Sequence, residues 1–169
     1  MDFLDEIETC VPALRRYARA LTRNADRADD LVQDCLERAI RKRGLFQPTG
    51  PVQAWLFRIL VNLWRNALRS ERRRGDHVAY DALLVEPSIP APQPGRLALG
   101  EMHRALDRLP DDQRETLLLV VLEGVSYQEA AAILGIPIGT VMSRLSRARA
   151  ALRALTGAGD DEPRLRSVK

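Results

Sequence analysis

Four arginines, Arg144, Arg147, Arg149 and Arg153, lie close together near the C-terminal end of the chain. No Asp or Glu occurs in residues 130–155, so this segment supplies no carboxylate to pair with them. Guanidinium groups bind phosphate oxygens, and they read guanine through its O6 and N7 atoms. The set therefore indicates contact with nucleic acid. A solvated helix surface is the simpler alternative, but such surfaces usually carry acidic partners four residues away.

The residues around these arginines predict a helix–turn–helix. Ser126 and Glu129 have the spacing of a capping box at a helix start. Gly135 can adopt the left-handed conformation that ends a helix, and Pro137 favours the start of the next one. In DNA-binding proteins of this type the second helix enters the major groove. We expect that helix to pack through Ile136, Val141, Leu145, Ala148 and Leu152 and to contact DNA through Gly139, Thr140, Ser143, Arg144 and Arg147. Arg149 and Arg153 are expected to meet phosphates or acids of their own domain.

A second basic segment, AWLFRILVNLWRNALRSERRR over residues 54–74, mixes arginines with aromatic residues. Basic groups follow a nucleic-acid backbone, and aromatic rings stack on exposed bases. Trp55 and Trp64 also fall on the apolar side of the predicted helix. For each of them, packing in the core is therefore the alternative to contact with a base. Asn62 carries an amide that can bond a base edge or simply face solvent.

Apolar residues recur every three and four positions on both sides of one break, which predicts an all-α protein. The break contains Pro87, Pro90, Pro92 and Pro94, a spacing that no helix tolerates. We therefore expect two small helical domains joined by a Pro-rich linker. The N-terminal domain covers 1–75, the flexible linker 76–96, the C-terminal helix–turn–helix domain 97–155, and a tail 156–169. Pro12 is expected to kink or restart the first helix.

Composition argues against several other functions. The formal net charge of the 169 residues is only +3. This charge is divided unevenly along the chain. Residues 1–75 carry 15 basic and 10 acidic groups, a net charge of +5, whereas residues 97–129 carry 3 basic and 7 acidic groups, a net charge of −4. Only His77 and His103 are histidines, and no glycine loop could cradle a phosphate, so we expect no catalytic residue, metal site or cofactor. Cys10 and Cys35 fall at apolar positions and are expected in the core. An acidic N-terminus and the lack of a long apolar run predict a cytoplasmic protein without a membrane span.

Three segments in this order resemble the sigma-70 family of RNA polymerase sigma factors, in their short extracytoplasmic-function (ECF) form. DDLVQDCLERA is similar to the family's polymerase-binding helix, and AWLFRILVNLWRNALR to its promoter-melting and −10-reading helices. LPDDQRETLLLVVLEGVSYQEAAAILGIPIGTVMSRLSRARAAL is similar to its −35-reading domain. The resemblance covers about residues 5–155.

This resemblance implies a role for each segment and three partners: core RNA polymerase, promoter DNA and an anti-sigma factor. Polymerase docking falls on Asp30, Leu31, Gln33, Asp34 and Glu37, for which a solvated acidic face is the alternative. The residues that correspond to the family's −10 contacts are Trp55, Asn62, Arg65 and Arg69. Those that correspond to its −35 contacts are the helix–turn–helix residues named above. The loop from Phe46 to Gln53 corresponds to the family's pocket for a flipped base.

Three rival hypotheses remain at this point. A stand-alone helix–turn–helix regulator would need an upstream ligand pocket or dimer seam, and no signature of either is visible. A nucleic-acid enzyme would need a catalytic constellation. An anti-sigma or adaptor protein would lack two separate DNA surfaces.

Overall fold

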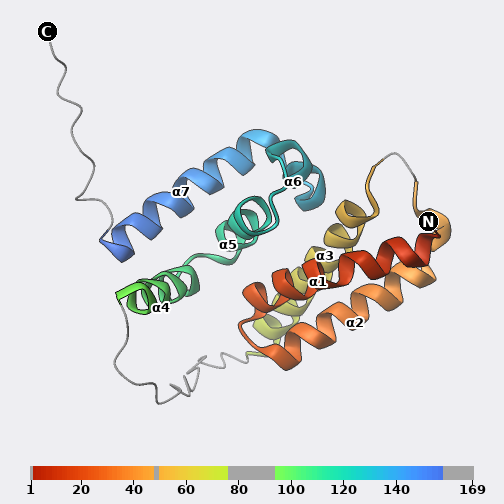
Figure 1. Cartoon of the computed structure of the whole chain (residues 1–169), viewed down its shortest axis with the longest axis horizontal. Coiled ribbons are helices and arrows are strands. Elements are labelled where there is room, and N and C mark those ends of the chain that lie inside the picture. Colours follow the sequence, from red (N-terminus) through yellow and green to blue (C-terminus); the bar gives the residue numbers. More distant parts are fainter. Residues whose placement is uncertain (1, 48–49, 76–93, 158–169) are drawn as a thin grey trace, which may run out of the picture.

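The computed structural model describes residues 2–47, 50–75 and 94–157, with side chains from residue 100 onward in the last range. These residues form helices and no strand, which confirms the all-α prediction. Three helices make up the N-terminal half, and four more with one π-helical turn make up the C-terminal half (Figure 1). Their bounds are α1 Phe3–Thr22, α2 Ala25–Arg41, a 3-10 turn η1 Arg43–Leu45, α3 Val52–Arg74, α4 Pro94–Asp107, α5 Asp111–Leu117, a π turn η2 Leu118–Leu122, α6 Tyr127–Leu134 and α7 Ile138–Thr156.

Most of the predicted linker, residues 76–93, lies outside the described residues, as does the tail beyond 157. Helix α4 begins at Pro94, so the last three residues assigned to the linker are helical. Helix α1 continues from Phe3 to Thr22 through Pro12, so the expected restart there is not observed.

The N-terminal half is a bundle of α1, α2 and α3 whose apolar faces meet in one core. The rings of Tyr17 and Phe57 pack edge to face at its centre, with centroids 5.3 Å apart. Helix α2 starts at Asn24, whose side chain accepts a hydrogen bond from the backbone N–H of Arg27 at 2.9 Å, as expected for a helix cap.

Cys35 lies in this core and donates a hydrogen bond through Sγ to the carbonyl of Leu56 at 3.4 Å. Burial raises the pKa of the Cys35 thiol to about 12. The thiolate is the reactive form, so at pH 8 Cys35 is expected to resist a thiol reagent in the native protein and to react once the chain is unfolded in urea. Mass spectrometry of the labelled protein measures this, with the half-buried Cys10 as the internal reference. Rapid native labelling of Cys35 would contradict its burial.

The C-terminal half is organised around the predicted helix–turn–helix. Ser126 and Glu129 form the capping box, and Gly135 ends α6 with a φ of +66°. Val141, Leu145 and Ala148 of α7 are buried as the sequence predicts. They pack against a second apolar cluster of this half, made with Leu109, Leu117 and Ala130.

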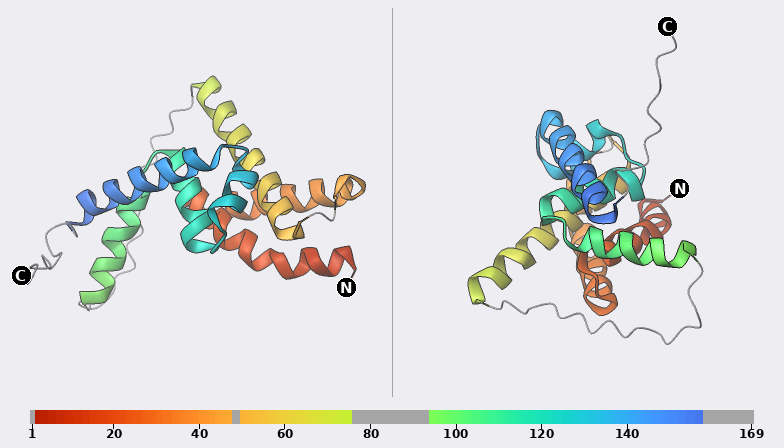
Figure 2. Two further views of the ribbon diagram at one scale, coloured as in Figure 1. Left: turned by 90° about the horizontal axis from the view of Figure 1, so that it is seen from above. Right: turned by 90° about the vertical axis from the view of Figure 1, so that its left-hand side faces the viewer.

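The two halves are in direct contact (Figure 2). Four apolar side chains of the C-terminal half belong to the core of the N-terminal bundle: Leu118, Leu119, Ile133 and Leu134. The hydroxyl of Tyr17 also donates a hydrogen bond to the backbone carbonyl of Glu115 at 3.0 Å. The assembly is therefore closed, with a continuous apolar core from one half to the other.

Candidate nucleic-acid interface

One face of α3 carries two of the four predicted −10 residues. Trp55 and Asn62 line a groove of about 270 Å³ between the end of α2 and α3. Three cationic side chains share that groove with them, namely Arg38, Lys42 and Arg58. No acidic residue of the described chain lines it. A basic groove with an aromatic wall suits a single nucleic-acid strand, because cations meet the phosphates and the ring can stack on a base.

Sequence reasoning missed Arg38 and Lys42 as members of this site, and it named Arg58 only as one of the arginines of the basic segment 54–74. The run RAIRKR at positions 38–43 was a usable signal, since its cations are concentrated at the C-terminal end of a helix. Their proximity to Trp55 depends on how α2 packs against α3, which the sequence pattern does not specify.

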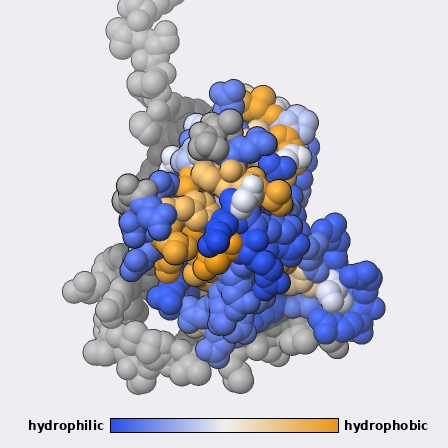
Figure 3. Space-filling model, turned by 90° about the vertical axis from the view of Figure 1, so that its right-hand side faces the viewer, coloured by the Kyte–Doolittle hydropathy of each residue, from blue (hydrophilic) through white to orange (hydrophobic). Residues whose placement is uncertain are grey.

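A second hollow of about 350 Å³ lies under the loop that follows η1. Phe46, Trp55 and Arg58 line it from the N-terminal half. Phe3, Phe46 and Trp55 form a ring cluster beside it, with centroids 5.4 to 6.0 Å apart. The space-filling view shows apolar side chains gathered on this end of the molecule (Figure 3). Residues 48–49 of the predicted base pocket lie outside the described residues.

Helix α6 closes the far side of this hollow. Ala132 and Ile133 of that helix are among its lining residues. A base that entered the hollow would therefore meet the helix–turn–helix half of the same chain.

Arg65, which the sequence assigned to the −10 surface, forms hydrogen bonds with residues of the C-terminal half. Its Nη2 lies 2.6 Å from Oε1 of Glu115, its Nε bonds both carboxylate oxygens, and its Nη1 donates to the carbonyl of Leu134 at 2.9 Å. Only 28% of the Arg65 side chain and 4% of the Glu115 side chain are exposed. Burial raises the pKa of the Glu115 carboxyl, and the hydrogen bonds from Arg65 oppose that rise. Arg69 is exposed and donates to the side chain of Asn66.

Arg144, the central residue of the predicted −35 set, faces the cleft between the halves. Its Nε lies 3.4 Å from Asp112 and its Nη1 3.5 Å from Glu115, and 19% of the side chain is exposed. The lack of acids in residues 130–155 predicted that the arginines of this helix have no acidic partner. For Arg144 that prediction is wrong, because Asp112 and Glu115 of α5 reach it from outside its own segment.

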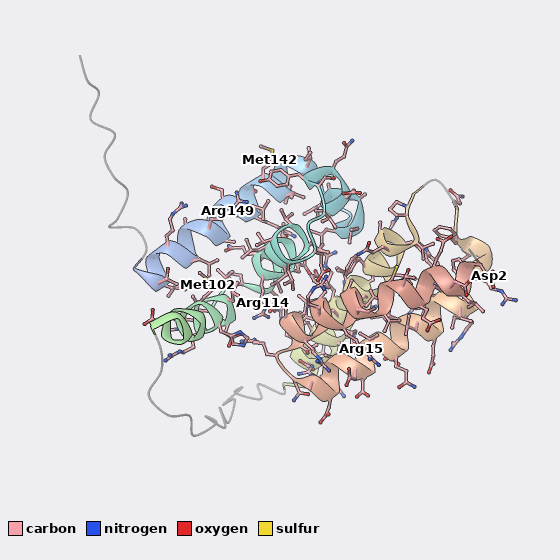
Figure 4. The ribbon with its side chains drawn as sticks, viewed as in Figure 1. Asp2, Arg15, Met102, Arg114, Met142 and Arg149 are labelled. Atoms are coloured by element: carbon pink, nitrogen blue, oxygen red, sulfur yellow. The ribbon has the colours of Figure 1, made fainter. Side chains whose placement is uncertain are left out.

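The rest of the −35 set lies on the outer part of α7. Arg147 is exposed, Gly139 has open space where a Cβ would be, and Ser143 donates its hydroxyl to the carbonyl of Thr140. Met142, which was not predicted as a contact residue, is 54% exposed at the outer edge of α7 (Figure 4). An exposed apolar group in the first half of a recognition helix can contact a thymine methyl.

The acidic helix α2 presents Asp30, Gln33, Asp34 and Glu37 to solvent. Gln33 donates to the carboxylate of Glu37 at 3.2 Å, one turn along the helix. Leu31 differs: it is 8% exposed and packs in the bundle core. It also lines a shallow hollow together with Asp30 and Asp34, and its role in docking stays a prediction.

Comparisons with known proteins give the family. Residues 7–61 match the family model described as the sigma2 domain of PhyR, and residues 99–152 match sigma-70 region 4. The chain is 47% identical over 151 residues to "ECF RNA polymerase sigma factor EcfG" of Rhodopseudomonas palustris (strain TIE-1), covering 89% of this chain and 83% of the relative. The chain belongs to the ECF RNA polymerase sigma factors. It is thus a transcription initiation factor that directs core polymerase to promoters.

Two solved structures are similar to this sigma factor. One is the sigma factor RpoE in complex with the anti-sigma factor NepR from Bartonella quintana, at 40% identity and a TM-score of 0.76, with 94% of this chain and 98% of that chain covered. The other is CnrH in complex with the cytosolic domain of CnrY, at 33% identity and a TM-score of 0.63, with coverages of 87% and 82%.

The described part of the sigma factor contains neither a candidate membrane span nor a candidate metal site. None of its described helices has the length and apolarity needed to cross a membrane. Its described His, Cys, Asp and Glu residues form no group able to hold a metal ion.

Proposed function

We propose that the two halves of this sigma factor have separate roles at the promoter. The N-terminal half holds polymerase through Asp30, Gln33, Asp34 and Glu37 of α2, and it binds the opened −10 strand along α3. The C-terminal half docks on the duplex −35 element through α7. The domain boundaries at about 75 and 97 are part of this proposal. The protein acts in the cytoplasm and performs no catalysis of its own.

One observation supports the strand-binding role above the others. Trp55 and Asn62 share a groove with three cations, and none of the described acids lines it. This groove thus holds both residues that the sequence assigned to base contact and residues suited to phosphate contact. Trp55, Asn62 and Arg69 supply the stacking, base-edge and phosphate contacts, and Arg65 joins them when its bond to Glu115 is released.

The experiment that tests the proposal is transcription in vitro with purified bacterial core polymerase on a genomic promoter library. The sigma factor is expected to yield a limited set of start sites that share two sequence elements. Heat-denatured protein is the control. Absence of any start-site selection would reject the proposed function.

Charge reversal on α2 tests the polymerase-docking face. Asp34→Arg is expected to weaken binding to core polymerase by about tenfold, because an exposed carboxylate at the interface becomes a repelled cation. The measurement is a titration of labelled sigma factor with core polymerase. Asp29→Arg makes the same charge change on the same helix outside the proposed face and should have a much smaller effect. Equal effects of the two variants would remove Asp34 from the docking face.

We further propose control by an anti-sigma factor. The first solved structure named above is a complex of a sigma factor with the anti-sigma factor NepR, and in the second CnrH, which bears the name of an RNA polymerase sigma factor, is bound to the cytosolic domain of CnrY. A partner of that kind would hold this chain in a form that cannot engage polymerase.

A further inference from the structure

A cavity of about 750 Å³ lies where α3, α5 and the turn between α6 and α7 meet. We name it the arginine cavity. Of its lining residues that the structure describes, six are arginines and four are carboxylates, a formal excess of two positive charges. The arginines are Arg23, Arg65, Arg69, Arg72, Arg114 and Arg144. A concave site with an excess of one charge concentrates ligands of the opposite charge, so the arginine cavity favours an anion.

Arg114 contributes a buried charge that its neighbours compensate only in part. The side chain is 2% exposed (Figure 4). Its Nη2 lies 2.8 Å from Asp111, and the same carboxylate also pairs with Arg72 at 3.1 Å. Its Nε and Nη1 have no hydrogen-bond partner in the described ranges. Burial, and then the nearby positive charge of Arg23, lower the pKa of the Arg114 guanidinium. A further anion close to Arg114 would relieve this unfavourable burial.

The arginine cavity also has cations that a ligand can reach directly. Arg69 and Arg72 of α3 are exposed and line it. They lie three residues apart and therefore on one face of the helix. Arg69 donates to the neutral amide of Asn66 and forms no ion pair with a described residue. Guanidinium groups bind phosphate oxygens through pairs of parallel hydrogen bonds, so these two side chains suit a phosphate group.

The size of the arginine cavity leaves room for more than one phosphate. Its volume falls in the range of about 300–1,000 Å³ that is typical of sites for small organic ligands. Leu109 and Ile136 are among its lining residues and provide apolar surface beside the charged groups.

We propose that the arginine cavity binds a diphosphate group, either as free pyrophosphate or as part of a nucleotide. Arg69 and Arg72 hold its oxygens, and its negative charge compensates the buried Arg114. A diphosphate supplies the multiple negative charges that match the excess of cations. Because the ligand binds the folded chain, its presence adds to the stability of the sigma factor, and the gain rises with ligand concentration. This inference does not depend on the roles proposed for the two halves at the promoter.

The first test is calorimetric titration of the full chain with sodium pyrophosphate in the absence of divalent cations. The wild type is expected to show saturable binding at a single site. Arg114→Met replaces the buried guanidinium with an apolar chain and is expected to weaken binding at least about tenfold. Arg108→Gln removes an exposed arginine that does not line the arginine cavity and should leave the affinity unchanged. Sodium sulfate at the same ionic strength is the control for general salt effects.

A second pair of variants guards against a folding defect at the buried position. Arg69→Gln changes an exposed side chain and is expected to weaken pyrophosphate binding about three- to tenfold. Arg73→Gln removes the same charge from the same helix at an exposed position outside the arginine cavity, and it should bind as the wild type does. Thermal unfolding gives an independent measurement. Pyrophosphate should raise the Tm of the wild type and of Arg73→Gln clearly more than that of Arg69→Gln.

A comparison of two ligands identifies the source of the diphosphate group. Tighter binding of ADP than of pyrophosphate would support a nucleotide, whose nucleoside part would meet the apolar surface of Leu109 and Ile136. Binding of ADP that is equal or weaker would support free pyrophosphate. The inference is overturned if neither ligand binds saturably, or if Arg114→Met and Arg69→Gln bind both ligands as the wild type does. Promoter selection with core polymerase is a separate measurement, so the proposed function would stand after such a result.

Discussion

Replacing Glu115 with alanine is expected to lower the free energy of unfolding by about 3 kcal/mol. Removing one partner of a buried ion pair leaves the other charge uncompensated, which costs about 3–5 kcal/mol. The lower end applies because 28% of the Arg65 side chain is exposed and part of its charge can be solvated. The variant also leaves Arg144 without its Glu115 contact. Urea denaturation followed by circular dichroism measures the loss.

A double variant separates the charge effect from the packing effect. Arg65→Met combined with Glu115→Leu replaces the pair with apolar groups of similar size, which is often neutral for stability. It is expected to recover most of the stability lost by Glu115→Ala. A double variant as unstable as the single one would show that the loss arises from local packing around α5 and not from an unpaired charge.

Arg147→Ala is expected to have a large effect on promoter choice. Arg147 is exposed on the outer part of α7, so it needs no rearrangement to reach a base edge. Loss of a base-reading arginine costs about 1–3 kcal/mol on the matching sequence and little on others. Transcription with core polymerase on the selected promoter and on a variant of its upstream element measures the difference.

Two comparisons sharpen this prediction. Arg153→Ala removes an exposed arginine two turns further along α7 and should weaken all promoters evenly, as expected for a phosphate contact. Arg144→Ala is expected to cost a similar 1–3 kcal/mol at the upstream element in the polymerase complex. An equal loss on every sequence for Arg147→Ala would make Arg147 a phosphate contact.

The buried cation Arg114 illustrates what no sequence pattern indicates. It is 2% exposed and lies between α5 and the N-terminal bundle (Figure 4). Its Nη2 donates to Asp111 at 2.8 Å, and its Nε and Nη1 find no hydrogen-bond partner among the described residues. Burial lowers the pKa of this guanidinium. The sequence shows an arginine at position 114 but gives no sign that it is buried. Only the packing of the two halves takes its side chain out of water.

The helices and the family could be predicted from the sequence. Apolar spacing predicted the helices, and Ser126, Glu129 and Gly135 predicted the turn of the helix–turn–helix, because capping and left-handed backbone are local properties. The order of three motifs then indicated a sigma factor. The charge difference between the two halves was also visible in the sequence, though not what each half would bind.

Which charged groups pair with one another depends on how the helices pack. Arg144 lacks an acid within its own segment, yet Asp112 and Glu115 reach it from another helix. Leu31 reads as a docking residue by motif and lies in the core, and Arg38 joins Trp55 only because α2 packs along α3. Ion pairs, burial and grooves depend on distances between segments far apart in the chain, and local spacing carries no information about those distances.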